Sequence, residues 1–504
     1  MTFQVTTATL VGIDAVPVTV EADISNGIPR MFIVGLPDTA VTEAQERVRS
    51  AIKNTPGIDF PLQRITVNLA PADVRKEGSA FDLAIALAIL GAKRSLIAPK
   101  RSVCVLGELS LDGQLRPTTG ILPIVASLFE QGVSAFIVPE ANAIEAGLVE
   151  SAAIYPVTSL REVVRHFRGS HSISQYVRAR TPRRTIVPSV DFRDIAGQHL
   201  AKRCLEIAAA GGHNLLFSGP PGSGKTLLAR AFLGILPALE GQEALEVTRI
   251  YSVAGLLDPS SPLVTVRPFR SPHHTASSAA IVGGGSNPHP GEITLSHRGV
   301  LFLDEFPEFP RAVLESLRQP LEDGFVNVSR AAMSVRFPSR FTLIASQNPC
   351  PCGYAGDPVN QCRCSAYQIE RYRRRISGPL IDRIDLRCDV PRQSSEVFGM
   401  SFESEASETI RGRVSSARLQ QRERFGNSGT MMNSEMSINE IKHFCILNER
   451  SRTLLHTAVD NLRLSGRAYH RVLKVSRTIA DLFGDEAISE THVAEALQYR
   501  QREK

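Results

Sequence analysis

The sequence predicts an α/β protein of several domains, with a parallel sheet in its central domain and helices at its C-terminal end. The chain has 504 residues, which is enough for about three domains at ~100–200 residues each. Short apolar strands alternate with helical stretches as far as Pro391, a pattern typical of sheets with crossover helices. After Arg392 only helical periodicity follows.

Composition excludes several classes of protein. Hydrophobic residues make up 43% and charged residues 21% of the chain, which is ordinary for globular domains and not for collagen or a disordered chain. The longest apolar run, around Leu83–Leu90, is far shorter than the ~18 residues that cross a bilayer, and the first residues lack a signal-peptide pattern. We therefore expect a cytoplasmic protein without membrane contact. The net charge of +6 suits an anionic partner but is mild for this length.

Residues 1–168 are expected to form an α+β domain. Its clearest elements are two strands and two helices, at Ser102–Leu106, Ala135–Val138, Ala80–Gly91 and Gly120–Gln131. Residues 169–189 are polar, basic and aperiodic, so they cannot bury an apolar face and are interpreted as a linker.

Residues 190–395 are expected to form the central domain, and residues 396–504 a helical domain. Three apolar strands of the central domain lie at Asn214–Ser218, Gly299–Leu303 and Arg340–Ala345. Four amphipathic helices of the last domain lie at Ile438–Cys445, Ser451–Leu464, Tyr469–Phe483 and Glu490–Arg500.

The strongest motif is a phosphate-binding loop between the first of these central strands and a helix. Its residues are Gly219, Pro220, Pro221, Gly222, Ser223, Gly224, Lys225 and Thr226, which fit the pattern G-x-x-x-x-G-K-[ST]. Glycines let backbone N–H groups turn toward phosphate oxygens at a helix N-terminus. Lys225 adds a point charge near the β/γ-phosphates, and Thr226 can bind Mg²⁺. The motif predicts ATP and Mg²⁺ as cofactors.

Polar side chains also follow the next two central strands. Asp304 and Glu305 end the strand after Gly299, an arrangement that carries Asp304 to Mg²⁺ and lets Glu305 polarise an attacking water. Asn348 follows the third strand, where it can orient water or the γ-phosphate. The alternative for Asn348 is a turn-forming residue before Pro349.

Four of the eight cysteines crowd into one short segment, as Cys350, Cys352, Cys362 and Cys364. Their thiolates can supply a tetrahedral, structural zinc site with no open catalytic position. The C-x-C pairs are tighter than the usual C-x₂₋₄-C knuckle, so reduced buried thiols or redox-labile cysteines are the alternative.

A strand-like alternation on both sides of a small turn predicts a β-hairpin over Phe325–Phe337. Arg330 lies at its turn and Arg336 on its second strand. Phosphate contact and a solvated surface hairpin are both open for these arginines. The basic run Arg371–Arg375 adds positive charge beside an aromatic residue, and arginines on a helix surface that pair across subunits are its alternative interpretation. His273 and His274 are interpreted as structural packing.

These residues resemble the AAA+ superfamily, and longer stretches resemble the YifB/ComM type of magnesium-chelatase-like ATPases over nearly the whole chain. The stretches that carry the resemblance are DIAGQ, PFRSPHHTASSAAIVGGGSNPHPGEITLSHRGVLFLDE, QNPCPCGYAGD, RRRISGPLIDRIDL and SGRAYHRVLKVSRTIADL. The resemblance implies an AAA+ core with a helix-two insert and a pre-sensor hairpin. It also implies a hexameric DNA helicase that promotes branch migration when transforming DNA is integrated.

The resemblance assigns roles to individual residues. Asp304 and Glu305 match the Walker B acids, Asn348 the first sensor, Arg383 the arginine finger and Arg467 the second sensor. It also places the hairpin with Arg330 and Arg336 in a central pore that holds single-stranded or branched DNA. The alternative for Arg383 is a surface ion pair with Asp382 or Asp385.

The stretches Ile65–Leu90 and Leu106–Gly132 are similar to the Lon-type proteolytic domain, which uses a Ser–Lys dyad. The match places Ala80 at the nucleophile, with Ser79 one residue early, and Leu122 at the lysine. We therefore expect a proteolytically inactive domain kept for assembly or DNA contact. Lys76 and Ser79 remain as a close pair in the sequence.

The leading hypothesis is an ATP-driven hexameric DNA motor of the helicase type. One alternative is the motor subunit of a metal chelatase that inserts Mg²⁺ into a porphyrin. Another is an ATP-switched protein remodeller or scaffold.

Overall fold

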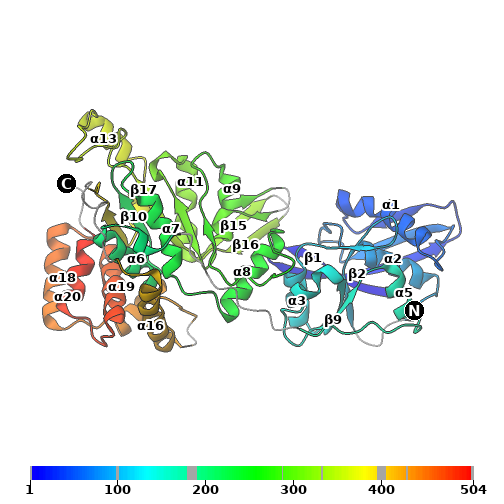
Figure 1. Cartoon of the computed structure of the whole chain (residues 1–504). Coiled ribbons are helices and arrows are strands. Elements are labelled where there is room, and N and C mark those ends of the chain that lie inside the picture. The colour runs from blue at the N-terminus through cyan, green and yellow to red at the C-terminus, as the bar shows by residue number, and fades with distance from the viewer. Residues whose placement is uncertain are drawn as a thin grey trace. The chain divides into compact units, whose positions relative to one another are not determined.

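The computed structural model describes seven stretches of the chain: residues 3–97, 102–178, 190–285, 288–330, 333–393, 404–426 and 429–500. The chain forms two units (Figure 1). The first contains residues 1–183 and 241–264, and the second contains residues 184–240 and 265–504. Residues 241–264, which the sequence places inside the central domain, thus belong to the first unit. Much of the expected linker, residues 179–189, lies outside the described residues.

A seven-stranded mixed sheet forms the centre of the first unit, in the order β3-β4-β2-β1-β5-β8-β9. Strands β1 and β2 form an antiparallel hairpin, β2 pairs antiparallel with β4, and the other neighbours are parallel. The strands are β1 Gln4–Val11, β2 Asp14–Ser25, β3 Met31–Val34, β4 Arg64–Ala70, β5 Val103–Val105, β8 Ala135–Pro139 and β9 Ala153–Val157. A small ribbon pairs β6 (Glu108–Leu109) with β7 (Leu115–Arg116).

Helix α2 (Asp82–Ala92) is the most buried element of the first unit. Every residue from Leu83 to Leu90 is at most 1% exposed, because the helix is apolar on all sides and packs on β1, β2 and α1. The other helices of this unit are α1 Thr39–Asn54, α3 Ile121–Glu130, α4 Ala143–Ala146, α5 Leu160–Phe167 and α8 Gly241–Val253.

Buried polar contacts join α8 to the rest of the first unit. The Gly120 N–H donates to the Ser252 carbonyl at 3.2 Å, and the Ser252 hydroxyl donates to Glu145 at 2.5 Å. Glu145 also accepts from the Leu122 N–H at 3.0 Å, so one buried carboxylate serves both α8 and the start of α3. These contacts explain why residues 241–264 fold with the N-terminal part of the chain.

The second unit is built on a sheet of five parallel strands in the order β11-β14-β17-β10-β18. The strands are β10 Leu215–Ser218, β11 Phe269–Arg270, β14 Val300–Leu303, β17 Thr342–Gln347 and β18 Leu386–Asp389. This confirms the predicted parallel sheet. Because the strands are parallel, their carboxyl ends meet at one edge, which is where ligands bind in open α/β sheets.

Helices surround this sheet and continue into the C-terminal part (Figure 1). They are α6 His199–Gly211, α7 Lys225–Ile235, α9 Ser278–Val282, α10 Glu292–Leu295, α11 Arg311–Ser316, α12 Arg318–Asp323, α13 Ala366–Arg373, α14 Gly378–Ile381, α16 Ser407–Phe425, α17 Ile438–Phe444, α18 Glu449–Leu462, α19 Gly466–Phe483 and α20 Glu490–Gln498. The helices and strands that the sequence analysis placed by residue lie within three residues of their expected bounds. Two small ribbons, β12 (Gly283–Gly284) with β13 (His289–Pro290) and β15 (Phe325–Arg330) with β16 (Met333–Pro338), match the expected insert and hairpin.

Helix α16 is the main element that sequence periodicity did not predict. Its inner face carries polar residues: the Arg418 guanidinium donates to the Ala209 carbonyl at 2.6 and 2.9 Å, and Gln421 donates to the Ala210 carbonyl at 3.1 Å. The last carbonyls of a helix lack partners within the helix, and these side chains supply them for α6. The same face also buries Ile410, Val414 and Phe425, so polar residues interrupt its apolar positions and weaken the apolar period.

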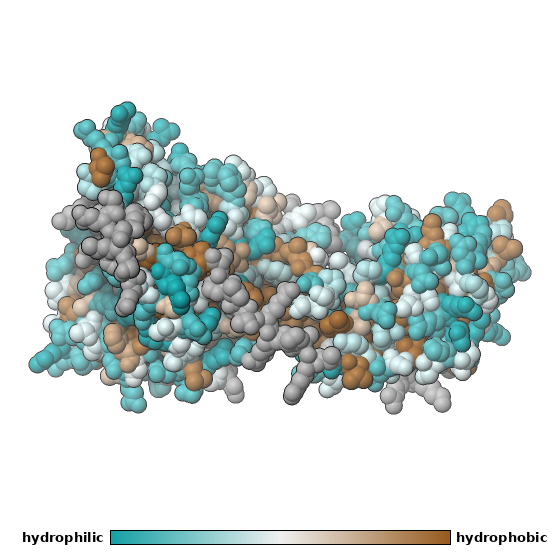
Figure 2. Space-filling view, viewed as in Figure 1, coloured by the Kyte–Doolittle hydropathy of each residue, from teal (hydrophilic) through white to brown (hydrophobic). Residues whose placement is uncertain are grey.

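No helix among the described residues is long and apolar enough to cross a membrane. Figure 2 shows hydrophobic residues in small groups among hydrophilic ones on the face in view.

We predict that Asp385, at the start of β18, is a main determinant of the second unit's stability. Its side chain is 6% exposed, accepts from the Asn214 N–H at 3.0 Å and pairs with Arg471 at 2.6 Å. Burial alone would raise its pKa, but Arg471 and His213 outweigh burial and hold the pKa well below its usual range. Asp385→Ala should lower the free energy of unfolding by about 3 kcal/mol, because it leaves buried partners without an acceptor.

Urea denaturation over a range of pH tests this. A carboxylate with a lowered pKa stabilises the fold above its unfolded pKa of about 4 and loses that effect as pH falls further. The difference in free energy of unfolding between wild type and Asp385→Ala should therefore be largest at pH 7 and should decrease below about pH 4. The control is Asp460→Ala, at an exposed position in α18. An equal, small effect of both substitutions would contradict the prediction.

Candidate active site

The phosphate-binding loop connects β10 to α7, and three of its glycines meet two backbone requirements. Gly222 and Gly224 have φ of +75° and +92°, in the left-handed region that side chains disfavour, and no atom lies within 4 Å of a Cβ placed at either. A Cβ on Gly219 would lie 2.2 Å from the Val390 carbonyl oxygen. The loop is therefore tight against the chain after β18 and open on the other side, toward the cleft.

Lys225 begins α7, and its side chain turns back over the loop. Its Nζ donates to the Gly219 and Pro220 carbonyls at 2.7 and 2.9 Å and to Asn348 Oδ1 at 3.3 Å. Burial lowers the pKa of Lys225, while Asp304 and Glu305 favour its charged form. Phosphate oxygens would compete with these neutral acceptors for the ammonium group.

Asp304 follows β14 and contacts the start of α7 and the end of β17. Thr226 Oγ1 donates to its Oδ2 at 2.8 Å, and Ser346 donates a short hydrogen bond to its Oδ1. A hydroxyl beside a carboxylate is the small oxygen donor set that Mg²⁺ uses when phosphates and waters complete its shell. Thr226 and Asp304 therefore fit the magnesium ion that the loop motif predicts.

Glu305 has a strained backbone beside Asp304. Its φ is +53°, in the left-handed region, and its N–H donates to Asp304 Oδ1 at 3.1 Å. Such conformations in residues other than glycine cluster at functional sites, because surrounding contacts must hold them. The Glu305 side chain is 53% exposed, so the carboxylate can reach solvent water.

His274 contacts this carboxylate, with its Nδ1 3.3 Å from Glu305 Oε2. It follows β11, which pairs with β14, and its ring lies against His273 and the edge of Phe309. The sequence predicts structural packing for His274 and gives no sign of this contact. The only sequence signal was its position after an apolar segment, and that segment forms a strand of just two residues.

The strand ends enclose a cleft of about 420 Å³. Its lining residues come from three strand ends and the start of α7: Pro221, Gly222, Ser223, Gly224, Lys225, Thr226, Leu227, Asp304, Glu305, Ser346, Gln347 and Asn348. The volume lies within the ~300–1,000 Å³ of small-molecule sites. The structure thus brings together the loop, both acids and Asn348 as expected, and it adds Ser346 and Gln347.

Arg383 and Arg467 line a different cavity, of about 530 Å³. Both pair with Glu322 at the end of α12, Arg467 at 3.3 Å and Arg383 in a short contact. Neither is among the residues that line the nucleotide cleft of the same chain. Burial and the neighbouring Arg467 lower the pKa of Arg383. Arg383 thus forms its ion pair with Glu322, and not with Asp382 or Asp385.

The hairpin of β15 and β16 forms in register, with Val328 opposite Val335. Arg330 ends β15, and its side chain lies outside what the structure describes. Arg336 is exposed, and its guanidinium lies 3.5 Å from the centroid of the Phe325 ring, at the base of the hairpin. A cation over an aromatic face is a favourable contact, so Arg336 is held away from the turn.

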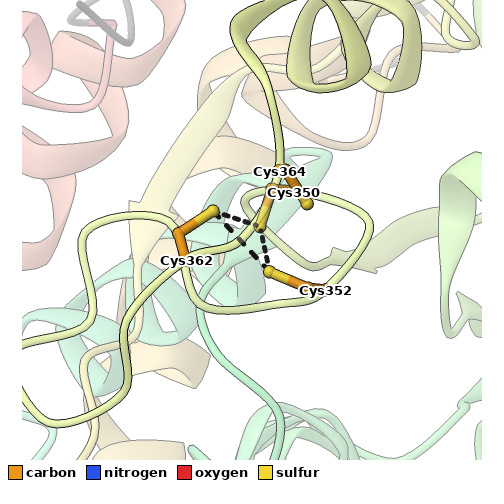
Figure 3. Close-up of side chains that lie close together, drawn as sticks. All are labelled: Cys350, Cys352, Cys362 and Cys364. Atoms are coloured by element: carbon orange, nitrogen blue, oxygen red, sulfur yellow. Dashed lines mark hydrogen bonds between the residues drawn. The ribbon is translucent and has the colours of Figure 1, made fainter.

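The four clustered cysteines converge in the loop between β17 and α13 (Figure 3). Their sulfur atoms all lie within 4.8 Å of one another, so the cluster can hold a metal ion.

In the first unit, Lys76 and Ser79 turn to different partners. The Lys76 ammonium donates to the Pro71 carbonyl, and the Ser79 hydroxyl donates to Glu108. Leu122, at the position of the lysine in the Lon-type dyad, is 1% exposed.

Comparison with known proteins identifies the family. Three family models match: "Magnesium chelatase, subunit ChlI" over residues 191–398, "Subunit ChlI of Mg-chelatase" over residues 20–142, and "Magnesium chelatase, subunit ChlI C-terminal" over residues 404–500. The competence protein ComM of Haemophilus influenzae is 45% identical over 496 residues, which cover 97% of this chain and 95% of that protein. The protein YifB of Salmonella typhimurium is 42% identical over 497 residues, which cover 98% and 96%. The chain belongs to the YifB/ComM group of magnesium chelatase-like ATPases.

The sequence matches bear on each of the two units. The second unit has the expected AAA+ core, with the insert ribbon β12–β13, the hairpin β15–β16 and a helical C-terminal part. The N-terminal part is related to Lon: the archaeal Lon protease of Thermococcus kodakarensis is 27% identical over 139 residues, which cover 27% of this chain and 22% of that protein.

We predict that His274 restrains Glu305. The His274 ring nitrogen lies 3.3 Å from the carboxylate, where it can hold the carboxylate away from an attacking water. His274→Ala should raise the basal rate of ATP hydrolysis about five-fold, which corresponds to ~1 kcal/mol for a partly exposed contact between a histidine and a carboxylate. Steady-state assays with Mg²⁺ measure this rate.

The control is His456→Ala, at an exposed position in α18 that does not line the cleft, and this change should leave the rate near the wild-type value. An unchanged or lower rate for His274→Ala would contradict the restraint.

Proposed function

We propose that this protein is an ATP-driven DNA motor that works as a ring of six identical subunits. Its proposed activity is helicase-type branch migration that supports recombination of transforming DNA. The observation that carries the proposal is the cleft at the sheet edge, where Lys225, Asp304, Glu305 and Asn348 converge. The name of one relative, a competence protein, supports the role with transforming DNA.

In the proposed reaction the cleft holds the triphosphate by the loop, with Lys225 on the β/γ-phosphates. Thr226 and Asp304 would hold Mg²⁺, which neutralises phosphate charge when bound. Glu305, next to Asp304 and exposed to solvent, orients the attacking water and accepts its proton. Asn348 lies within hydrogen-bond distance of the Lys225 ammonium and fixes its direction.

The position of the two arginines supports action between subunits. Arg383 and Arg467 share one acidic partner, Glu322, in a cavity separate from the nucleotide cleft. An arginine finger must reach the γ-phosphate, where it stabilises transferring charge. In the proposed ring, this cavity of one subunit faces the nucleotide cleft of the next, and Glu322 holds both guanidinium groups until they engage.

DNA contact is assigned to the ribbons that extend from the second unit's core. The hairpin β15–β16 carries Arg330 and Arg336, and the ribbon β12–β13 has glycines that admit close backbone approach. Arginines beside aromatic rings suit a single strand, because they combine phosphate attraction with stacking. The net charge of +6 agrees with an anionic partner.

A chelatase motor is the second candidate, because all three matching family models are named for a magnesium chelatase subunit. Stimulation of ATP hydrolysis by a porphyrin, with none by DNA, would favour it.

We predict that DNA stimulates ATP hydrolysis at least several-fold. The assay compares no DNA, single-stranded DNA and a four-way junction at several salt concentrations, since phosphate contacts weaken with salt.

Two substitutions in the cleft test the ATPase site itself. Lys225→Ala should lack hydrolysis. Glu305→Gln should still bind ATP but lose about 10²-fold or more in rate, as expected for loss of a general base. Normal turnover by Lys225→Ala would overturn the cleft assignment, and equal rates with and without DNA would overturn the motor.

We also predict that Arg383 acts on the neighbouring subunit. Arg383→Ala and Lys225→Ala should each be nearly inactive, whereas a mixture of the two should recover hydrolysis. Random assembly of a head-to-tail ring at equal amounts pairs an intact cleft with an intact arginine at about a quarter of the interfaces. Arg371→Ala, at an exposed position in α13, is the control and should remain active. A mixture no more active than its components would contradict action between subunits.

A further inference from the structure

The cysteine cluster has a geometry that suits one metal ion. The Cys350 and Cys352 sulfurs are 3.3 Å apart, and Cys362 Sγ lies 3.7 Å from the first and 3.6 Å from the second (Figure 3). Four thiolates at about 2.3 Å from a central zinc ion stand about 3.8 Å from one another, the edge of a tetrahedron. The observed distances approach this edge.

These distances also exclude a disulfide bond and argue against an iron–sulfur cluster. A disulfide bond is about 2.05 Å long, and all eight cysteines of the chain are free. The ligands of an iron–sulfur cluster stand farther apart, because the cluster's own sulfides lie between them. A single tetrahedral ion bound by four thiolates is typical of zinc.

Backbone donors surround the sulfurs. The Ala355 N–H donates to Cys350 Sγ at 3.3 Å, and the backbone N–H groups of Arg363 and Tyr354 donate to Cys352. Outer contacts of this kind orient metal ligands and offset their negative charge. The loop is thus arranged around four sulfur atoms, with Cys350 buried and the other three cysteines half-buried.

The same loop packs on the nucleotide cleft. Cys350 is two residues after Asn348, the residue that binds the Lys225 ammonium. Gly353, with φ of +86°, approaches the phosphate-binding loop so closely that a Cβ there would lie 2.7 Å from Pro221 Cδ and 3.9 Å from Asn348 Cγ. A loop closed by its four sulfurs therefore supports Pro221 and Asn348 from one side.

We propose that Cys350, Cys352, Cys362 and Cys364 bind one structural zinc ion, and that this ion holds the loop against the phosphate-binding loop, which makes nucleotide binding depend on zinc. The zinc site stands on the sulfur geometry alone. Its coupling to nucleotide rests on the proposed function of the cleft, and separate experiments test the two parts.

Metal content of the full chain, purified under reducing conditions, tests the zinc site. We expect about one zinc ion per chain. Cys352→Ser and Cys364→Ser should each lower this content, while Cys445→Ala, which changes a buried cysteine outside the cluster, should not. Because a cysteine variant can misfold, Co²⁺ exchanged into the wild type provides a second measurement: it should give the absorption of tetrahedral thiolate coordination. Zinc-free wild type without this cobalt absorption would overturn the site.

Two matched glycine variants test the coupling. Gly353→Ala places a methyl group against Pro221, whereas Gly356→Ala, with a similar φ of +78°, meets no atom within 4 Å. Both should keep zinc, but only Gly353→Ala should weaken binding of an ATP analogue, by about ten-fold, as for loss of a supporting contact. Removal of zinc from the wild type with a chelator should weaken binding of the ATP analogue by a similar factor. Equal nucleotide affinity in both variants and in chelated protein would overturn the coupling. A protein that binds nucleotide normally yet shows no DNA stimulation would instead refute the motor.

Discussion

The parallel pairing of β10, β14 and β17 is the constraint on which the candidate site depends. Backbone hydrogen bonds set Leu215 beside Ile344 and Ile344 beside Phe302, so the three strands end together. The phosphate-binding loop, the two acids and Asn348 each begin where a strand stops. A slip of one residue would turn every side chain to the opposite face and separate these groups, so the buried apolar strands fix the chemistry by fixing their register.

The site has charged side chains near the buried edge of the sheet, and opposite charges or hydrogen-bond donors lie next to each of them. Lys225 is desolvated but faces Asp304 and Glu305, and Asp304 accepts hydroxyl donors from both sides. Glu305 has a left-handed backbone that its neighbours must hold. These charged groups are already in place before a triphosphate and its metal ion bind. Binding therefore needs little rearrangement of the protein, and such preorganised charges favour the reaction.

No arginine among the described residues lines the cleft, and this has consequences for assembly. Arg383 and Arg467 are held by Glu322 in a separate cavity, so the proposed reaction needs a second subunit to complete it. The cysteine loop supports the cleft from another side, through Gly353 and Pro221. Subunit contact and metal binding would then act on the same few residues, Asn348 and the phosphate-binding loop.

The sequence by itself determined the parts that contiguous residues encode: the parallel strands, the phosphate-binding loop, the two acids after β14, the hairpin and most helices. Local residue spacing is enough to predict these elements, because strand and helix periods are visible within a dozen residues. Only the tertiary structure placed His274 beside Glu305, since the pairing of a two-residue strand with β14 leaves no local pattern. It also decided that Glu322 binds both arginines and that residues 241–264 join the first unit. Such contacts join polar groups far apart in the chain, and their partners are chosen by packing.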